Sequence, residues 1–243
     1  MTMTKTITSP HNEKLREIRK LGQRRRDRDR DSRFVAEGED LLAAADAAGW
    51  IAVERFCAAG SGLSGTEVEP ALLVQASALG SGTRTLAVYE ERWQAASIGP
   101  LCIYLHGVRD PGNIGTVLRS ARAFGASSVA FGPGCADPYG PRAIRASMGA
   151  VFASALARAG AVSELPGQTV ALATDGATTL DELELDQARD VTLLIGAERE
   201  GLPAKVLEAC DRTARIPIAT HSLNVAMAAT VALYEVSRMR ADE

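Results

Sequence analysis

Short, nearly continuous apolar runs alternate with amphipathic segments over the second part of the chain. These runs predict four strands, at residues 101–105, 128–131, 169–173 and 191–195. They lack the alternation of a half-exposed strand, which is typical of strands buried on both faces of a parallel sheet. Residues 113–124 carry apolar side chains at helical spacing, so we expect a helix that packs on this sheet. The pattern predicts an α/β fold with a parallel sheet covered by helices.

The first part of the chain shows a second, smaller α/β pattern. Residues 34–38 predict a short strand that ends in a turn, and residues 39–48 predict a helix closed by Gly49. Further strands are expected at residues 53–57 and 86–89.

Residues 90–100 separate the two patterns. The segment is polar, follows no clear period and ends in Gly99-Pro100, so we interpret it as an interdomain linker. The predicted boundary lies near residue 97, which gives domains 1–97 and 98–243.

Charge is distributed unevenly along the chain. Residues 1–33 hold eleven Lys or Arg and five Asp or Glu, a balance of +6, which leaves −9 for the rest. Leu15, Ile18 and Leu21 form the apolar stripe of a predicted helix whose other faces are basic. A basic arm on an acidic body favours a polyanionic partner such as nucleic acid, because neutralised phosphates release counterions. From charge alone, a solvated helix with internal salt bridges explains the same pattern, so both interpretations stay open.

Composition narrows the classes of protein. The chain is 46% hydrophobic and 23% charged, within the globular range. It has no uncharged apolar run of about 18 residues and no secretory signal pattern, so we expect a cytoplasmic protein with no membrane partner. The four cysteines lie far apart and only three histidines are present, so neither a disulfide framework nor a metal site is expected.

The first of three motifs follows the strand at residues 101–105. It reads His-Gly-Val-Arg-Asp-Pro-Gly-Asn-Ile-Gly-Thr-Val-Leu-Arg over residues 106–119. It predicts a turn and then a helix that Asn113 caps. Alone, it describes a capped helix with solvated arginines, but loops at the carboxyl ends of parallel strands are where α/β proteins bind ligands.

The second motif, Gly-Ala-Glu-Arg-Glu-Gly-Leu-Pro at residues 196–203, directly follows a predicted strand. The missing side chain at Gly196 is expected to let a ligand approach the backbone. The third motif combines Ile-Pro-Ile at residues 216–218 with Ser-Leu-Asn-Val at residues 222–225, before a long Ala-rich helix. Pro217 predicts an irregular loop because it cannot donate to a central ladder, and Ser222 is expected to cap the helix.

Together and in this order, the three motifs resemble the SpoU, or TrmH-like, family of RNA 2′-O-ribose methyltransferases over residues 101–240. Residues 137–149 look like the family's Arg-and-Ser-Gly helix. Residues 7–12 and 34–38 are similar to the N-terminal substrate-binding domain of the rRNA-directed branch. The resemblance implies a C-terminal parallel-sheet SPOUT domain with a trefoil knot, preceded by a small α/β domain like a ribosomal protein. It also implies S-adenosyl-L-methionine as cofactor, 23S-type rRNA as substrate, and a homodimer.

The resemblance assigns roles to individual residues. The expected catalytic group, with Arg119 as its centre, is Arg119, Asn113, Ser222, Asn224 and Glu198. The expected cofactor contacts are Thr174, Gly176, Gly196, Ile216, Ile218 and Leu223. The expected RNA contacts are Lys14, Arg16, Arg19, Lys20, Arg24, Arg25 and Arg142. The expected dimer stripe on the last helix is Met227, Val231 and Tyr234, a pattern that an ordinary core-facing helix would share.

The sequence departs from the family pattern near the third motif. Ile218 replaces a common methionine, and the loop that contains His221 is short. His221 is either a surface-loop residue or a general base, given the pH range in which histidine titrates.

Three other functions stay open at this point. The same chemistry on tRNA is one, and a non-catalytic RNA-binding or ribosome-assembly protein is another. A nucleotide-dependent oxidoreductase is the third, but the chain lacks the Gly-x-Gly-x-x-Gly loop that such proteins use.

Overall fold

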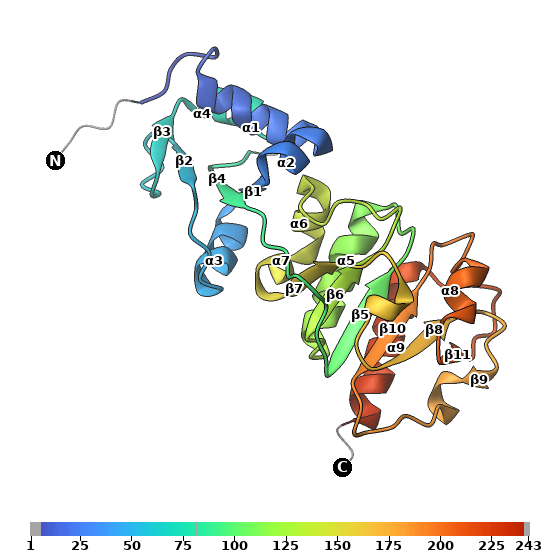
Figure 1. The fold of residues 1–243 in the computed structure, drawn as a ribbon. Coiled ribbons are helices and arrows are strands. Elements are labelled where there is room, and N and C mark those ends of the chain that lie inside the picture. The colour runs from blue at the N-terminus through green and yellow to red at the C-terminus, as the bar shows by residue number, and fades with distance from the viewer. Residues whose placement is uncertain (1–5, 81, 241–243) are drawn as a thin grey trace. The chain divides into compact units, whose positions relative to one another are not determined.

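The computed structural model describes residues 6–80 and 82–240, which form two compact units (Figure 1). The first unit contains the described residues up to Glu91 together with Asp137–Ala153. The second unit contains Arg92–Ala136 and the described residues from Ser154 onward. The main difference from the predicted division at residue 97 is the segment 137–153. The prediction places it in the second domain, whereas it packs in the first unit.

The first unit is built on a four-stranded sheet in the order β1-β4-β2-β3. Strand β4 pairs antiparallel with β1 and β2, and β3 pairs parallel with β2. Its strands are β1 (Arg33–Glu37), β2 (Glu54–Ala58), β3 (Thr66–Val68) and β4 (Thr85–Glu90). Its helices are α1 (Glu13–Gln23), α2 (Arg25–Asp31), α3 (Glu39–Ala47), α4 (Pro70–Ala76), α6 (Pro141–Ser147) and α7 (Ala150–Ala153).

Helix α1 buries the apolar stripe that its sequence predicts. Leu15, Ile18 and Leu21 are each at most 1% exposed and pack in one cluster with Leu73 of α4 and Phe56 of β2. The basic positions are left on the other faces of the helix, so the amphipathic prediction is confirmed.

An aromatic cluster and the ion pair of Arg28 with Asp137 hold residues 137–153 in the first unit. The ring of Phe34 stacks on Tyr139 at a centroid distance of 4.6 Å and on Tyr89 at 5.7 Å. Trp50 packs edge-on against Phe152, and its indole Nε1 donates a hydrogen bond of 2.7 Å to the main-chain oxygen of that residue. Buried aromatic pairs of this geometry contribute about 0.5–1.5 kcal/mol beyond burial. No sequence periodicity indicates which sheet a short helix covers, so this placement was not predictable.

The second unit contains a seven-stranded sheet in the order β7-β6-β5-β10-β8-β11-β9. All its strand pairs are parallel. Its strands are β5 (Leu101–Leu105), β6 (Ser128–Phe131), β7 (Ala155–Arg158), β8 (Gln168–Leu172), β9 (Thr178–Thr179), β10 (Val191–Ile195) and β11 (Arg212–Arg215). Its helices are α5 (Pro111–Ala123), α8 (Ala204–Glu208) and α9 (Val225–Met239), with short 3-10 turns η1 (Val162–Glu164) and η2 (Leu180–Glu182).

The predicted strands at residues 101–105, 128–131 and 191–195 are confirmed, and the fourth lies one residue earlier than expected, at 168–172. Sequence patterning misses β7, β9 and β11, which are two to four residues long and include polar or charged positions. The parallel α/β fold is therefore confirmed, and Pro217 lies outside the strands as expected. The trefoil knot stays a prediction.

The predicted linker packs with the second unit. The main-chain nitrogen of Gln94 donates to the oxygen of Leu156, and the Trp93 ring meets Phe131 edge-on at 6.0 Å. These contacts explain why the division by packing falls at residues 91 and 92 instead of at 97.

Membrane-spanning helices and clusters of metal-binding side chains are both absent from the described residues. No helix among them is long and apolar enough to cross a membrane. In residues 6–80 and 82–240, no group of three or more His, Cys, Asp or Glu side chains is placed to hold a metal ion.

Replacing Phe34 tests the aromatic cluster. Phe34→Ala is expected to lower the free energy of unfolding of the first unit by about 3–5 kcal/mol, because the ring is fully buried and leaves a cavity. Urea unfolding monitored by tryptophan fluorescence measures this, since Trp50 lies in the cluster. Val74→Ala, at an exposed position of the same unit, is the control and is expected to change the value by less than about 0.5 kcal/mol. A loss below about 1 kcal/mol for Phe34→Ala would contradict the assignment.

Candidate functional site

A cleft of about 970 Å³ opens at the carboxyl ends of β8 and β10 in the second unit. Its walls come from the loops after these two strands and from the segment between β11 and α9. Seven of the sequence-predicted site residues line it: Thr174, Gly196, Glu198, Ile216, Ile218, Ser222 and Leu223. The topology brings the second and third motifs together because parallel strands end at the same edge of the sheet.

A chain of side-chain hydrogen bonds joins all three motifs. The amide nitrogen of Asn113 donates to Oε1 of Glu198, and Nδ2 of Asn224 donates to Oδ1 of Asn113 at 3.2 Å. These partners are 85 and 111 residues apart in sequence. Asn113 therefore connects the start of α5 to the loop after β10 and to the start of α9.

The helix caps differ from the prediction. Asp110 caps α5, with its Oδ1 accepting from the main-chain nitrogen of Asn113 at 2.9 Å, and Pro111 occupies the first turn. Asn224 caps α9, with its Oδ1 accepting from the nitrogens of the second and third helical residues. The expectations that Asn113 and Ser222 are the caps were wrong. Because Asp110 satisfies the helix end, the side chain of Asn113 is available for its two bonds across the site.

The glycines of the site are required by the fold of the loops themselves. A Cβ added to Gly196 would lie 2.1 Å from the carbonyl carbon of Gly201, because the loop folds back and Ala197 pairs with Gly201. A Cβ on Gly176 would lie 2.4 Å from the carbonyl carbon of Ala214. The reason predicted for Gly196, room for a ligand, is therefore not the constraint that the structure shows. Gly176 does not line the cleft, although its neighbours 174 and 175 do.

Arg119 lies on an exposed part of α5 and is not among the residues that line the cleft. Within the part of the chain that the structure describes, its guanidinium has no hydrogen-bond or ion-pair partner. Helix α5 packs on α9, where Ser120 and Thr230 share a hydrogen bond of 2.6 Å. Packing on α9 therefore holds helix α5 in place, while the guanidinium of Arg119 stays exposed and can bind an anionic group.

The cleft also contains polar residues that sequence reasoning missed. They are Asp175, Thr179, Arg199, Glu200, Arg215 and Thr220. Arg215 closes one wall, since its Nη1 donates to the main-chain oxygen of Gly176 at 2.8 Å. Several of these residues directly adjoin the predicted ones, so position beside the strand ends was the available signal. His221 lines the cleft and is exposed.

Tyr104 and His106 form a polar pair at the end of β5. The tyrosine hydroxyl lies 3.0 Å from Nδ1 of the histidine. Burial raises the pKa of Tyr104 to about 12 and lowers the pKa of His106. Both side chains are therefore neutral at pH 7, and the pair adds no charge at this edge of the sheet.

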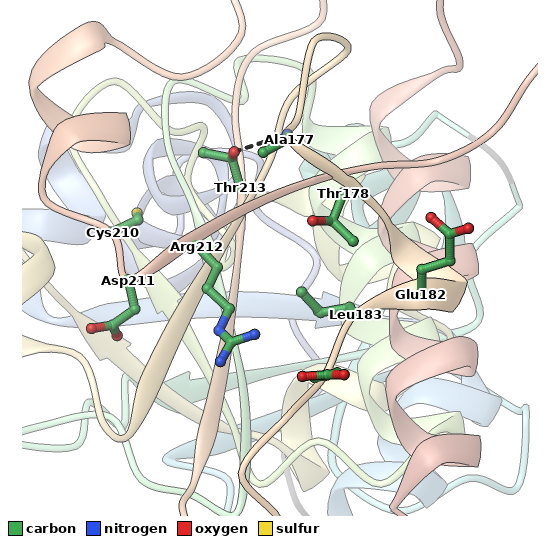
Figure 2. Close-up of a pocket in the computed structure, with 9 residues that line it drawn as sticks. Ala177, Thr178, Glu182, Leu183, Cys210, Asp211, Arg212 and Thr213 are labelled. Carbon is green, nitrogen blue, oxygen red and sulfur yellow. Dashed lines mark hydrogen bonds between the residues drawn. The ribbon is translucent and has the colours of Figure 1, made fainter.

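A second hollow of about 470 Å³ lies beside β9 and β11. Figure 2 shows residues that line it, among them Glu182, Arg212 and Thr213. It contains none of the predicted site residues. Its Asp211 is bound to the fold, since one carboxylate oxygen accepts from the main-chain nitrogen and hydroxyl of Thr169 at 2.7 and 2.9 Å. These bonds lower the pKa of Asp211.

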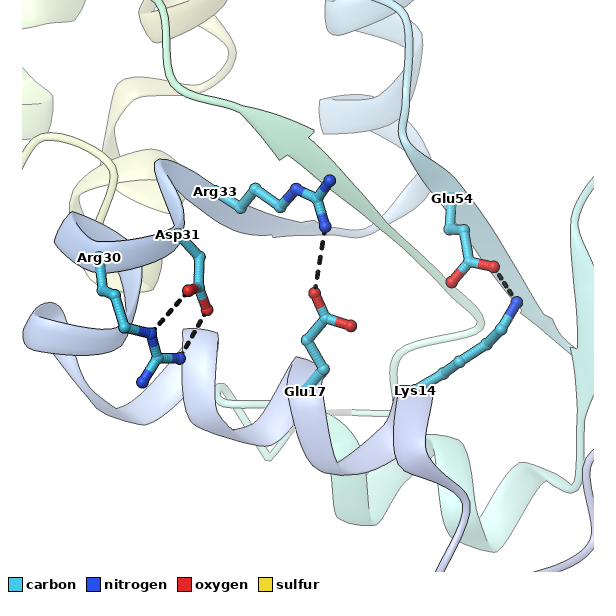
Figure 3. A network of polar contacts seen from close by, with 6 residues as sticks. All are labelled: Lys14, Glu17, Arg30, Asp31, Arg33 and Glu54. Atoms are coloured by element: carbon cyan, nitrogen blue, oxygen red, sulfur yellow. Dashed lines mark hydrogen bonds and ion pairs between the residues drawn. The ribbon is translucent and has the colours of Figure 1, made fainter.

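Several predicted RNA contacts on α1 and α2 have partners within the first unit. Lys14 pairs with Glu54, as Figure 3 shows. Arg19 donates to two main-chain oxygens, at 3.1 and 2.8 Å. Arg16 and Arg25 form exposed ion pairs with carboxylates of their own helices, at 3.7 and 3.5 Å. Exposed pairs contribute only about 0–1 kcal/mol, so these contacts do not fix the side chains strongly.

The other three predicted RNA contacts, Lys20, Arg24 and Arg142, are exposed. Neither Arg24 nor Arg142 has an ion-pair partner among residues 6–80 and 82–240. All seven assignments stay predictions.

An α/β protein with a large cleft at the carboxyl edge of a parallel sheet belongs to a class that binds small ligands there. Residues 100–234 match the model of the SpoU rRNA Methylase family, and the chain belongs to this family.

Among curated relatives, a 23S rRNA (uridine(2479)-2′-O)-methyltransferase of Streptomyces viridochromogenes is 37% identical over 142 residues, covering 54% of this chain and 50% of that protein. A Mycobacterium bovis protein described as an uncharacterised tRNA/rRNA methyltransferase is 38% identical over 148 residues, covering 55% of this chain and 50% of its own length. The chain spans about half the length of the curated relatives it matches.

Solved structures match over nearly the whole chain. The AdoMet-bound rRNA methyltransferase from Sinorhizobium meliloti has a TM-score of 0.85 at 29% identity, covering 97% of this chain and 98% of that one. The SpoU methyltransferase AviRb from S. viridochromogenes, in complex with AdoMet, has a TM-score of 0.83 at 26% identity, covering 95% and 98%. The similarity therefore includes the first unit as well as the second.

Replacing Gly196 tests the close approach of the loop. Gly196→Ala is expected to lower the free energy of unfolding by about 1–3 kcal/mol, because backbone atoms of residues 201 and 202 must move to admit the methyl group. Thermal and urea unfolding measure this loss. Gly82→Ala is the matched control, since its added Cβ meets no atom within 4 Å. Equal stability of the two variants would refute the steric argument.

Proposed function

We propose that this chain is an S-adenosylmethionine-dependent methyltransferase that methylates a ribose 2′-hydroxyl in RNA, and that this RNA is 23S-type, large-subunit rRNA. The observation that carries the proposal is the hydrogen-bonded chain from Glu198 through Asn113 to Asn224, which joins all three motifs beside one large cleft. Membership of the SpoU rRNA Methylase family and the likeness to AdoMet-bound rRNA methyltransferases support it.

The cleft suits the cofactor in size and in chemistry. Its volume of about 970 Å³ lies within the range of small-molecule sites, about 300–1,000 Å³. Ile216, Ile218 and Leu223 offer apolar surface for an adenine ring, and main-chain groups at the strand ends offer hydrogen bonds to it. The cleft is lined by three carboxylates (Asp175, Glu198 and Glu200) and two guanidinium groups (Arg199 and Arg215), so it can meet both the positive and the negative groups of a zwitterionic ligand. When bound, S-adenosylmethionine supplies an electrophilic methyl group on its sulfonium.

The residues of this chain then have distinct tasks. Asn113 and Asn224 hold the loops in place, and Ser222 lies on the cleft wall where a hydroxyl can orient the ribose. We assign Arg119 to the RNA phosphate and to the negative charge that develops on the 2′-oxygen. A guanidinium stays protonated, with a pKa above about 12, so Arg119 stabilises charge and a phosphate oxygen or a transient base takes the proton.

The choice of rRNA over tRNA is supported by coverage. A solved structure that concerns 2-OH methylation of C/U34 on tRNA matches 60% of this chain, with a TM-score of 0.52. The Sinorhizobium meliloti rRNA methyltransferase matches 97%, including the first unit. We therefore assign recognition of rRNA to the first unit, and a cytoplasmic location stays a prediction.

A homodimer is part of the proposal. Met227, Val231 and Tyr234 are 62%, 41% and 53% exposed, and they follow helical spacing along one face of α9. An apolar stripe of this kind on a helix surface is typical of an interface. The buried residues of α9 are not those of the stripe, and the helix packs on α5 and β10. The Tyr234 ring meets Phe124 edge-on at 5.7 Å but is still 53% exposed, so packing within the chain leaves much of the stripe uncovered.

Replacing Arg119 tests the catalytic assignment. Arg119→Ala is expected to lower methyl transfer by about 10²-fold or more, because a charge that stabilises the transition state is lost. Cofactor affinity measured by calorimetry is expected to change less than about twofold, since Arg119 does not line the cleft. Transfer is measured as incorporation of labelled methyl from S-adenosylmethionine into rRNA, and label at the ribose is resistant to alkali.

Arg212→Ala, an exposed arginine outside the cleft, is the control and is expected to retain wild-type transfer. Near-full turnover by Arg119→Lys would exclude a specific guanidinium role. Failure of the wild-type protein to bind the cofactor or to label either naked rRNA or ribosomal particles would refute the proposed function.

The dimer is tested on the exposed stripe of α9. Val231→Lys is expected to shift the protein from dimer to monomer in sedimentation, because a charge would be buried in an apolar interface. Val74→Lys, at a valine of the first unit with nearly equal exposure (39% against 41%), is the control and is expected to stay dimeric. A monomeric wild-type protein would overturn this part of the proposal.

A further inference from the structure

Three segments of the first unit meet at one buried arginine. The Nε of Arg28, on α2, lies 2.7 Å from Oδ2 of Asp137, and the two side chains are 7% and 10% exposed. Its Nη1 donates to the main-chain oxygen of Leu21, in the last turns of α1, at 2.6 Å. A Cβ built on Gly140, the N-cap residue just before α6, would lie 3.6 Å from Nη2 of Arg28. Arg28 therefore joins α1, α2 and the start of α6, although its ion-pair partner is 109 residues away in sequence.

Exposed arginines flank this junction on both helices. Arg24 is the N-cap of α2, and its main-chain oxygen accepts from the nitrogen of Arg28 at 3.4 Å, so it lies one turn before the buried arginine. Arg142 lies two residues after Gly140, and Arg145 follows one helical turn later on the same face. All three are exposed. In the described part of the chain, none of their guanidinium groups has a hydrogen-bond or ion-pair partner.

This lack of partners contrasts with two exposed arginines of α2. Arg25 pairs with Asp29, and Arg30 pairs with Asp27 and Asp31. The protein is net acidic, at −3, so carboxylates to pair with are abundant. Positive charges that lie close together without counter-charges repel one another. Binding of an anionic partner offsets this repulsion, because each guanidinium is then attracted to a negative group.

We propose that Arg24, Arg142 and Arg145 form one phosphate-binding surface, here called the α2–α6 basic face, which binds the RNA backbone. Arg28 and Asp137 act as positioning residues, because their buried pair sets the start of α6 against α2. The choice of RNA among polyanions rests on the proposed function. This surface differs from a simple basic arm, since two of its three arginines come from a segment more than 100 residues further along the chain.

Salt-dependent RNA binding by the full-length protein tests the surface. The probe is deproteinised large-subunit rRNA, and filter binding is measured from 50 to 300 mM salt. Each of Arg24→Gln, Arg142→Gln and Arg145→Gln is expected to weaken binding about four- to sixfold at 0.15 M salt and to reduce the slope of log K against log salt by about 0.7–0.9. The triple variant is expected to lose about two orders of magnitude.

Arg84→Gln is the matched control, because Arg84 is an exposed arginine of the same unit that pairs with Glu39. It is expected to keep the wild-type slope. If the triple variant keeps the wild-type slope of log K against log salt, the proposal is overturned. It is also overturned if the wild-type protein binds DNA of the same sequence as tightly as rRNA, because RNA is then not the specific partner.

The positioning role has a separate readout. Asp137→Asn removes a negative charge, which by itself would strengthen RNA binding. We expect weaker binding and a lower slope instead, with Asp137→Glu restoring part of both, because geometry is lost while every arginine is kept. Stronger binding by a folded Asp137→Asn protein would reject the positioning role. If Asp137→Asn does not fold, rRNA binding by the three arginine variants still shows whether the α2–α6 basic face binds RNA.

The outcomes separate this inference from the proposed function. Wild-type protein that binds rRNA through these arginines but transfers no methyl would refute the methyltransferase and retain the surface. If the wild-type protein transfers methyl groups and the triple variant binds rRNA as tightly as the wild type, the α2–α6 basic face is refuted and the proposed methyltransferase function is retained.

Discussion

One asparagine side chain holds the candidate site together. Asn113 uses its amide nitrogen on Glu198 and its amide oxygen on Asn224. The orientation of both amides follows from the helix start: Oδ1 of Asn224 accepts from main-chain nitrogens of α9, so its Nδ2 faces Asn113 and must meet an acceptor. Asn113 then presents its own nitrogen to the carboxylate of Glu198. Each group along this chain has a donor facing an acceptor, and reversing any one of them would leave two like groups opposed.

The parallel sheet makes this link possible. Strands β5, β10 and β11 belong to the same parallel sheet, and one of the three motifs follows the carboxyl end of each, so all three motifs lie at one edge. Backbone contacts then shape the loops, above all where the chain at Gly196 approaches Gly201. The cleft is thus a product of strand order and of close main-chain packing, and the polar chain fixes the loops that border it.

The sequence predicts these features to different degrees, and the reasons are physical. Fully buried strands such as β5 and β10 have an unmistakable continuous apolar pattern. Strands β9 and β11 do not, because they are short, lie toward the edge of the sheet and carry polar side chains. Cap positions were misassigned because Asp110 and Asn113 are both good capping residues, and only the bond geometry distinguishes them. The three motifs identified seven of the residues that line the cleft, but the contacts that make glycine necessary at Gly196 join main-chain atoms and leave no pattern of side chains.

Polar groups in this protein fall into two kinds, which suit different tasks. Asn113, Asn224 and Asp137 are held by partners within the chain, so they define geometry. Arg119 and Arg142 are exposed, and neither has a side-chain partner in the described part of the chain. A guanidinium already paired with a carboxylate must break that pair before it can bind a phosphate, whereas a solvated one exchanges only water and counterions. In a chain that carries more carboxylates than cations, keeping these arginines unpaired while burying Arg28 against Asp137 separates the residues that position from those that bind.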